Sequence, residues 1–178
     1  MKKKESFQFI LIPYRELSKL KNNSLIKFTE NIIKGNILIG LEKNYPNILQ
    51  WYQTKVLPGL ETGEREIIFA CKFDKNEFQN SQFLEVLGYV ILKKTPKEKK
   101  ICTIRVEPQY RNMGIGEALL KRSFIFLDTS LPMITISEDN IKYFKKLLEK
   151  YKFRLIEKKK DLYIKGKIEY IYNERWEK

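Results

Sequence analysis

The chain has 178 residues, of which 43% are hydrophobic, and it carries 35 Lys and Arg against 22 Asp and Glu, for a formal net charge of +13. This length and apolar content suffice to bury a core, so we expect a single domain over residues 1–178. No run approaches the roughly 20 apolar residues of a membrane span, which argues against a membrane protein.

The cysteine content argues against a metal or redox centre. Cys71 and Cys102 are far apart in the sequence, and the chain has no histidine to complete a zinc site. No metal site is therefore expected. We expect both cysteines to be reduced core thiols in a cytoplasmic protein.

The basic excess has two interpretations. Lys and Arg that neutralise phosphates would suit a nucleic-acid or ribosome partner. An AT-rich genome also encodes lysine wherever the surface tolerates it, and the runs at 97–100 and 158–160 fall in predicted hairpin turns. We favour the compositional interpretation and keep nucleic acid as an alternative partner.

The amino-terminal part predicts strands alternating with helices. Residues 1–12 resemble the opening of a signal peptide, but Pro13 and the polar residues after it stand where a cleavage site would be, so 7–12 is expected as the first strand. The further elements expected are one or two amphipathic helices within 14–34, a helix over 48–57 that ends at Pro58 and Gly59, a strand over 64–72, and a strand over 83–93 with Gly88 as a bulge or close-approach point.

The next segment predicts a strand, a tight loop and a helix. Residues 101–106 suit a strand, Pro108 ends its pairing because proline lacks an N–H donor, and an apolar-periodic helix begins near Gly114. The first amides of such a helix have no internal partner and attract an anion. Gly114 and Gly116 leave the backbone open to a pyrophosphate, and Arg111 places a positive charge beside it.

The loop pattern distinguishes between possible anions. No Lys-Ser or Lys-Thr follows the second glycine, and there is no Gly-x-Gly-x-x-Gly run, so neither an ATP loop nor an NAD loop fits. The pattern Arg111-x-x-Gly114-x-Gly116, directly after a strand that ends at Val106, resembles the acyl-CoA pyrophosphate loop of the GNAT superfamily of N-acyltransferases. That motif is Arg/Gln-x-x-Gly-x-Gly/Ala.

The resemblance implies an α+β fold with a GNAT-like twisted mixed sheet of about six to seven strands, flanked by helices and splayed at its centre to bind acyl-CoA. The elements that complete this order are a helix over 116–127, a strand over 133–137, a helix over 140–151, and strands over 153–157 and 162–172. Residues 1–63 would then form the acceptor side, 64–172 the acyl-CoA core and 173–178 a tail.

Acetyl-CoA is the cofactor that the resemblance implies. The amides of Ile104 and Val106 are candidates to pair with pantetheine and to hold the thioester carbonyl, where they would also stabilise an oxyanion. The full set of candidate cofactor-binding residues is Ile104, Arg105, Val106, Arg111, Asn112, Met113, Gly114, Ile115, Gly116 and Asn140.

The general acid of the family is not reproduced at its usual position. Family members often carry Tyr-Glu-Lys-x-Gly-Phe, whose tyrosine protonates the departing thiolate, whereas this chain has Leu148 at the tyrosine and Lys152 at the glycine. Tyr151 is three residues from Leu148 and Tyr143 is five, so Tyr151 is nearer the same helix face and both are candidate acids. Both also suit a structural role as core or rim aromatics.

The candidate general base is a carboxylate near the central strand. Glu98 precedes this strand and is ranked first, because side chains upstream of the acetyl position can line the acceptor channel, with Glu107 and Glu85 as alternatives. Strand alternation places Cys102 on the same face as Ile104. A structural role is expected for this cysteine, since the chain has no histidine that could activate a thiol.

Three functional hypotheses follow. The first is an acyltransferase of the EC 2.3.1 class, an N-acetyltransferase in which a primary amine attacks acetyl-CoA directly in a ternary complex. The second is a catalytically weak CoA-binding regulatory or interaction module, and the third is an RNA- or ribosome-associated acetyltransferase that acts as a toxin or modifier. The acceptor, whether a small molecule, a protein or an aminoacyl-tRNA, stays open, as does the choice between monomer and homodimer.

Overall fold

The structure is a computed structural model that describes residues 8–19, 45–73 and 85–175. Its elements, in chain order, are β1 (Gln8–Pro13), α1 (Tyr14–Lys19), α4 (Ile48–Trp51), η2 (Tyr52–Val56), α5 (Leu57–Thr62), β2 (Arg65–Phe73), β3 (Val86–Lys94), β4 (Lys99–Val106), η3 (Pro108–Tyr110), α6 (Ile115–Leu127), β5 (Met133–Ser137), α7 (Ile141–Lys150), β6 (Leu155–Lys160) and β7 (Ile168–Tyr172). Among the described residues, no helix is long and apolar enough to cross a membrane.

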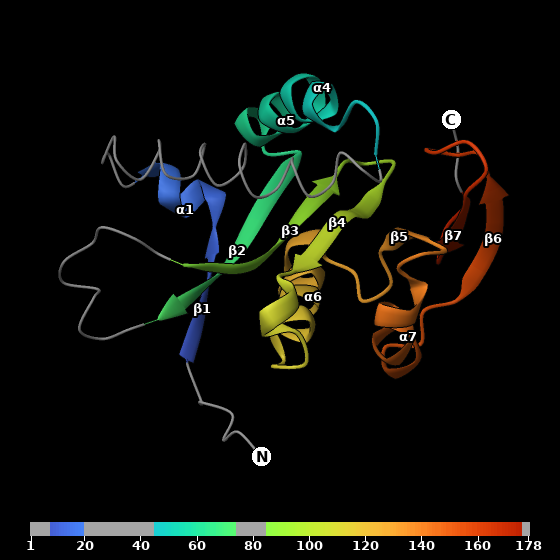
Figure 1. Cartoon of the computed structure of the whole chain (residues 1–178). Coiled ribbons are helices and arrows are strands. Elements are labelled where there is room, and N and C mark those ends of the chain that lie inside the picture. The colour runs from blue at the N-terminus through green and yellow to red at the C-terminus, as the bar shows by residue number, and fades with distance from the viewer. Residues whose placement is uncertain (1–7, 20–44, 74–84, 176–178) are drawn as a thin grey trace, which may run out of the picture.

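The strands form one seven-stranded mixed sheet in the order β1-β2-β3-β4-β5-β7-β6 (Figure 1). All neighbouring strands run antiparallel except β4 and β5, which are parallel. The α+β fold with a mixed sheet of six to seven strands is therefore confirmed.

Helices cover both faces of the sheet. The α4 face is covered by α1, α4 and η2, and its core includes Leu17, Ile48, Tyr52, Val56, Ile67, Phe69, Cys71, Tyr89 and Ile91. The α6 face is covered by α6 and α7, and its core includes Ile68, Ala70, Leu87, Val90, Leu92, Ile101, Ile115, Leu119, Leu120, Leu127, Ile134, Ile136, Leu148 and Tyr172. Alternate residues of β2 therefore supply two separate apolar layers.

The central pair of strands meets over a short distance only. β4 and β5 pair at Lys100 with Met133 and at Ile101 with Ile134, and their later residues have no register partners across this seam. The strands therefore separate toward their carboxyl ends, as the predicted splay requires. Beyond Ile101, β4 keeps its pairing with β3 and presents its other edge to the gap.

Two bulges interrupt the alternation of the central strands. Ala70 pairs with Gly88 and Cys71 with Val86, which leaves Leu87 as the extra residue of β3. Gly88 is also a close-approach point, because an added Cβ would lie 2.5 Å from the carbonyl oxygen of Arg105. The close approach predicted at Gly88 is confirmed, and the bulge lies one residue before it, at Leu87.

The second bulge corrects the expected orientation of Cys102. Leu92 pairs with Ile101 and Ile91 with Thr103, so Cys102 is an extra residue in β4. The side chain of Cys102 packs on the α4 face, whereas Ile101 and Ile104 pack on the α6 face. The prediction that Cys102 shares a face with Ile104 was wrong, because the bulge reverses the alternation between them.

The helix after Ile48 does not end at Pro58 and Gly59 as expected. It passes through the five π-helical residues of η2 and continues as α5 to Thr62. Pro58 lies in the first turn of α5, where a missing N–H donor is tolerated. The helix ends instead at Gly63, whose φ of 77° gives the left-handed conformation typical of a C-terminal cap.

The last hairpin is shorter than predicted. β6 and β7 cover Leu155–Lys160 and Ile168–Tyr172, so the strand expected from 162 begins six residues later. Asp161 and Gly166 both have positive φ, and the Gly166 N–H donates to the Asp161 carboxylate, which closes a loop between the strands.

The other predicted elements agree with the structure within a few residues at their ends. The strand expected at 7–12 is β1, and the helix expected from residue 14 is described as far as Lys19. The rest of the helical prediction, from 20 to 34, lies outside the described residues, as do the first two residues of the strand predicted from 83.

Candidate active site

The loop between β4 and α6 forms a turn of exposed backbone amides. Asn112 and Gly114 have φ values of 63° and 82°, and Gly114 is the N-cap of α6 with no side-chain hydrogen bond to the helix. The first intrahelical bond is donated by the Ala118 amide to the Gly114 carbonyl, at 3.0 Å. The preceding helical amides have no intrahelical acceptor and point out of the positive end of α6.

The side chains around this turn anchor it to the core. Ile115 is buried on the α6 face, and Met113 packs against the same cluster. Asn112 is exposed at the turn. The helix start is therefore fixed by apolar contacts, and its amides need no role in holding the fold together.

Gly116 leaves space that the fold does not fill. A Cβ added to Gly116 would lie 3.6 Å from Val106 Cγ2 and 3.9 Å from Leu147 Cδ1, which is ordinary van der Waals contact. Gly116 also has no positive φ, unlike Gly114, so an alanine would suit the helix better. The packing around Gly116 therefore does not itself require a glycine at this position.

The open edge of β4 leads from this turn toward the centre of the sheet. The Glu107 amide donates to the Leu87 carbonyl on β3 at 2.9 Å, so the polar groups of Val106 point to the opposite edge, toward the gap. The Val106 carbonyl accepts a hydrogen bond from Arg111 Nε at 3.3 Å. By the same alternation, the groups of Ile104 also face the gap.

Arg111 and Tyr143 come together at the mouth of the gap. The guanidinium of Arg111 lies 4.8 Å from the centre of the Tyr143 ring, and Tyr143 is 54% exposed. Asn140, the N-cap of α7, donates from Nδ2 to Ser137 Oγ at 2.9 Å. Three of the candidate residues thus lie on the elements that border the gap. Arg105 pairs with Glu107, with 3.2 Å between Nε and Oε1.

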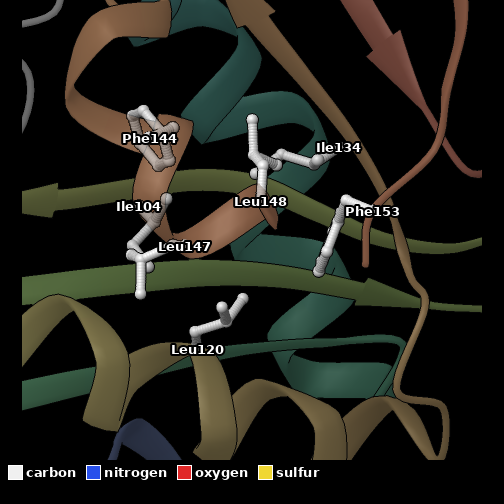
Figure 2. A pocket seen from close by; sticks show the side chains of 7 residues that line it. All are labelled: Ile104, Leu120, Ile134, Phe144, Leu147, Leu148 and Phe153. Carbon is white, nitrogen blue, oxygen red and sulfur yellow. The ribbon is translucent and has the colours of Figure 1, made fainter. Parts of the chain in front are cut away.

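The α6 face of the gap is closed by apolar side chains. A small cavity of about 10 Å³ lies there, and Figure 2 shows the side chains that line it, which come from β4, β5, α6, α7 and the segment after α7. They are Ile104, Leu120, Ile134, Phe144, Leu147, Leu148 and Phe153. Leu148, which stands at the family's tyrosine position, is therefore a buried core residue.

Tyr151 is held by α6. Its hydroxyl donates to Glu117 Oε1 at 2.7 Å, and its ring packs edge-to-face on Phe124 with 5.4 Å between centroids. Hydrogen bonds from Lys150 and Tyr151 lower the pKa of Glu117 to about 2. The structure thus gives Tyr151 a partner other than a ligand.

The predicted carboxylate bases are all ion-paired. Glu98 lies in the β3–β4 hairpin and forms a short ion pair with Lys93. It precedes the point at which β4 pairs with β5, whereas the turn that begins α6 lies beyond the opposite end of β4. Glu85 accepts a hydrogen bond from Tyr110 and lies 3.8 Å from Lys72 Nζ.

A polar cluster that the sequence analysis missed lies on the α4 face, where β4, β5 and β7 meet. Its members are Tyr45, Lys100, Thr135, Ser137, Tyr163 and Glu169. The Tyr163 hydroxyl lies 3.4 Å from Lys100 Nζ and 3.5 Å from Thr135 Oγ1. The signal in the sequence was Glu169, a single charged residue in the otherwise apolar and aromatic strand 168–172.

Cys71 and Cys102 are free thiols. Burial raises the pKa of the Cys71 thiol to about 12, which leaves it protonated and unreactive. Cys102 accepts a hydrogen bond from Arg65 at 3.4 Å. Within the described ranges, no group of His, Cys, Asp and Glu side chains is placed to hold a metal ion.

A sequence model of the acetyltransferase (GNAT) family matches residues 41–148, which include the β4 strand, the turn of amides and most of α7. The chain belongs to the acetyltransferase (GNAT) family. A sequence comparison with curated proteins finds no match. Family membership makes this protein an acyltransferase of the GNAT fold, as the loop motif indicated.

Solved structures resemble this GNAT protein over nearly its whole length. A chain of the NatC complex bound to Gag peptide and CoA is 14% identical, with 93% of this chain and 96% of that chain covered and a TM-score of 0.61. A protein described as a GNAT acetyltransferase from Desulfovibrio desulfuricans is 17% identical, with 93% and 97% covered and a TM-score of 0.58. A GNAT acetyltransferase from Staphylococcus aureus Mu50 is 15% identical, with 93% and 99% covered and a TM-score of 0.57. At these identities the similarity supports the fold alone.

Proposed function

We propose that this GNAT protein is an N-acetyltransferase of the EC 2.3.1 class that transfers the acetyl group of acetyl-CoA to a primary amine by direct attack in a ternary complex. One observation carries the proposal: the uncapped amides at the start of α6 adjoin the open edge of β4 at the gap between β4 and β5. This arrangement offers an anion site and, next to it, a strand edge for an extended amide chain.

Acetyl-CoA is the cofactor that family membership implies, and the residues around the gap suit it. The amides of Ile115 and Gly116 would bind the pyrophosphate, with Arg111 as a fixed positive charge. The polar groups of Ile104 and Val106 would pair with the pantetheine arm and hold the thioester carbonyl, where an amide donor favours the oxyanion of amide formation.

The acceptor side is the less defined part of the proposal. We assign it to residues 1–63 and the acyl-CoA core to 64–172, within a single domain and in the cytoplasm. Protein amino groups are one acceptor class to test. Small amines and aminoacyl-tRNA are the others, and a monomer or homodimer serves equally well.

One observation favours a second candidate, a CoA-binding module with weak catalysis. The tyrosine position of the family is occupied by Leu148, which is buried among apolar side chains. In this case Tyr143 and Tyr151, our candidate acids, and Glu98, our first candidate base, would have only structural roles. Turnover of acetyl-CoA with an amine separates the two functions, because a binding module would bind acetyl-CoA without releasing the CoA thiol.

The test is calorimetric titration of acetyl-CoA into the purified protein and into Gly116→Val and Arg111→Ala variants. We expect binding to the wild type, loss of binding in Gly116→Val because the side chain blocks the amides, and a loss of about 1 to 3 kcal/mol in Arg111→Ala. Arg154→Ala, at an exposed arginine far along the chain, is the matched control and should bind as the wild type does. Unchanged affinity in a folded Gly116→Val protein would overturn the assignment of the site.

A further inference from the structure

The two faces of the gap between β4 and β5 differ in polarity. On the α6 face the gap is filled by apolar side chains such as Ile134 and Leu148 (Figure 2). Because side chains alternate along a strand, Thr135 and Ser137 of β5 point to the α4 face, opposite to their neighbours Ile134 and Ile136. A charged acceptor would therefore find polar partners on the α4 face, whereas the described side chains that line the cavity on the α6 face are apolar.

Glu169 is the most unusual member of the polar cluster. It lies on β7 directly across from Ser137, and it points to the α4 face because Tyr170 and Tyr172 pack on the α6 face. Only 2% of the residue is exposed, and its Oε2 atom has no hydrogen-bond partner among the described residues. A buried carboxylate oxygen without a partner is costly, and proteins seldom keep one unless it serves a ligand or a reaction.

Titratable groups on the neighbouring elements surround Glu169. They are Lys100 on β4, Glu138 and Asp139 after β5, Lys159 on β6, and the tyrosines Tyr45 and Tyr163. Burial raises the pKa of Glu169 to about 7, and Asp139 and Glu138 add to this, while Lys100 opposes it. Lys159 is the register partner of Glu169 on β6, but the described residues show no ion pair between them.

Lys100 is a second buried charged residue of the same cluster. It is 6% exposed, its Nζ lies 3.4 Å from the Tyr163 hydroxyl, and burial lowers its pKa. Lys100 is also one of the two residues of β4 that pair with β5, so it marks the point from which the gap opens. The carboxylate and the start of the gap therefore belong to one polar cluster on one face.

We propose that Glu169 is a catalytic residue that binds the ammonium group of the acceptor and takes its proton before attack on the thioester. The proposal rests on the proposed function, because it assumes a thioester held in the gap. The proposed base is therefore not a carboxylate on or beside β4, such as Glu98. It is a carboxylate on β7, the strand that pairs with β5, on the polar side of the gap. The unpaired Oε2 atom is the site that the ammonium would occupy.

The step balances as follows. The acceptor enters as R–NH₃⁺ and gives one proton to the Glu169 carboxylate, and the neutral amine then attacks the thioester carbonyl carbon. A C–N bond forms and the C–S bond breaks, and the second ammonium-derived proton passes from nitrogen to the thiolate of CoA. Glu169 returns its proton to water at the end of the cycle. An alkylamine needs such a base near neutral pH, whereas an aromatic amine is already neutral, so the inferred acceptor class is an alkylammonium.

The test uses n-butylamine as the probe acceptor and the release of the CoA thiol from acetyl-CoA as the readout. In the wild type, kcat/KM should rise with pH through a midpoint of about 7. In Glu169→Gln, kcat/KM should fall on the order of 100-fold above this midpoint and the limb near 7 should vanish, while acetyl-CoA affinity stays within about twofold. Glu157→Gln, at a carboxylate on β6, is the matched control and should keep the wild-type profile.

A second measurement tests the role of Glu169 even if n-butylamine is not a substrate. In protein labelled with ¹³C at glutamate carboxyl carbons, one resonance should titrate near pH 7, should be missing in Glu169→Gln, and should move to lower pKa when n-butylammonium is added. The proposal is overturned if n-butylammonium leaves the pKa of this resonance unchanged, or if Glu169→Gln keeps the wild-type pH profile of kcat/KM. If the wild type itself fails to bind acetyl-CoA, the proposed function is what has failed.

Discussion

Two glycines on either side of Val106 are predicted to have opposite roles, and substituting each by alanine separates them. Gly88 lies opposite Val106 on β3, and an added Cβ would be 2.5 Å from the Arg105 carbonyl oxygen. Normal contact is about 3.5 Å, so the two backbones would have to move apart by about 1 Å. Neither atom belongs to a flexible side chain, and the central pairing of the sheet has to absorb the whole shift.

We expect Gly88→Ala to lower the free energy of unfolding by about 3 kcal/mol, the upper end for overpacking in a core. For a chain of this length, that corresponds to a fall in Tm of about 6 to 12 °C. Urea denaturation followed by circular dichroism measures the change. A difference from the wild type below about 0.5 kcal/mol would refute the reasoning, because it would mean that β3 and β4 are not held at this separation.

Gly116→Ala is the matched control. Its Cβ would meet Val106 and Leu147 at ordinary contact distances, and alanine has the higher helix propensity, so stability should be unchanged or higher by up to about 1 kcal/mol. Acetyl-CoA affinity should change little, because the GNAT motif accepts alanine at this position and only a larger side chain, as in Gly116→Val, blocks the helix amides. If Gly116→Ala instead destabilised the protein as Gly88→Ala does, the glycine would serve the fold and not a ligand.

Three further predictions concern buried and paired groups. Because the pKa of Glu169 is raised from 4.5 to about 7, the folded state keeps a proton that the unfolded state loses, so the free energy of unfolding of the wild type falls as pH rises through this range. Between pH 5 and 8, urea denaturation should show the free energy of unfolding of Glu169→Gln rising by about 1 to 3 kcal/mol relative to that of the wild type. The pKa of Glu117 is lowered to about 2, so its ion pairs stabilise the fold above about pH 4.5 and this stabilisation is lost as the pH falls toward 2. In urea denaturation, Glu117→Gln should be less stable than the wild type at pH 6 and equal to it near pH 2. Leu148→Tyr should lower the free energy of unfolding by about 1 to 3 kcal/mol, measured by thermal denaturation, because a cavity of about 10 Å³ cannot hold a phenol ring. The same variant should not raise acetyl-transfer activity.

The sequence predicted the cofactor side of the molecule well because that side depends on local rules. Pro108 after a β-branched run, and Gly114 before an apolar-periodic segment, determine where β4 ends and α6 begins, and the structure places both boundaries within two residues of the prediction. The mixed sheet followed from the order of elements. The glycine at position 114 also indicates, from the sequence, the positive φ that the structure has there.

What the sequence did not reveal depends on contacts between distant segments. The bulge at Cys102 arises from the pairing of β4 with β3, and no local signal marks which residue is extra. The rule that proline breaks helices predicts a helix end at Pro58, but the π-helical residues before it let the helix continue to Thr62, where Gly63 caps it. Glu169 was overlooked because its burial results from three strands and two tyrosines that meet only in the folded chain.

The short seam between β4 and β5 has a mechanical consequence. Two register pairs join a four-stranded half of the sheet, β1 to β4, to a three-stranded half made of β5, β7 and β6 (Figure 1). A ligand in the gap would contact both halves and act as a clamp across the weakest line of the sheet. Amide hydrogen exchange should therefore slow in both β4 and β5 when acetyl-CoA binds, with the amides of Ile104 and Val106 among the most affected.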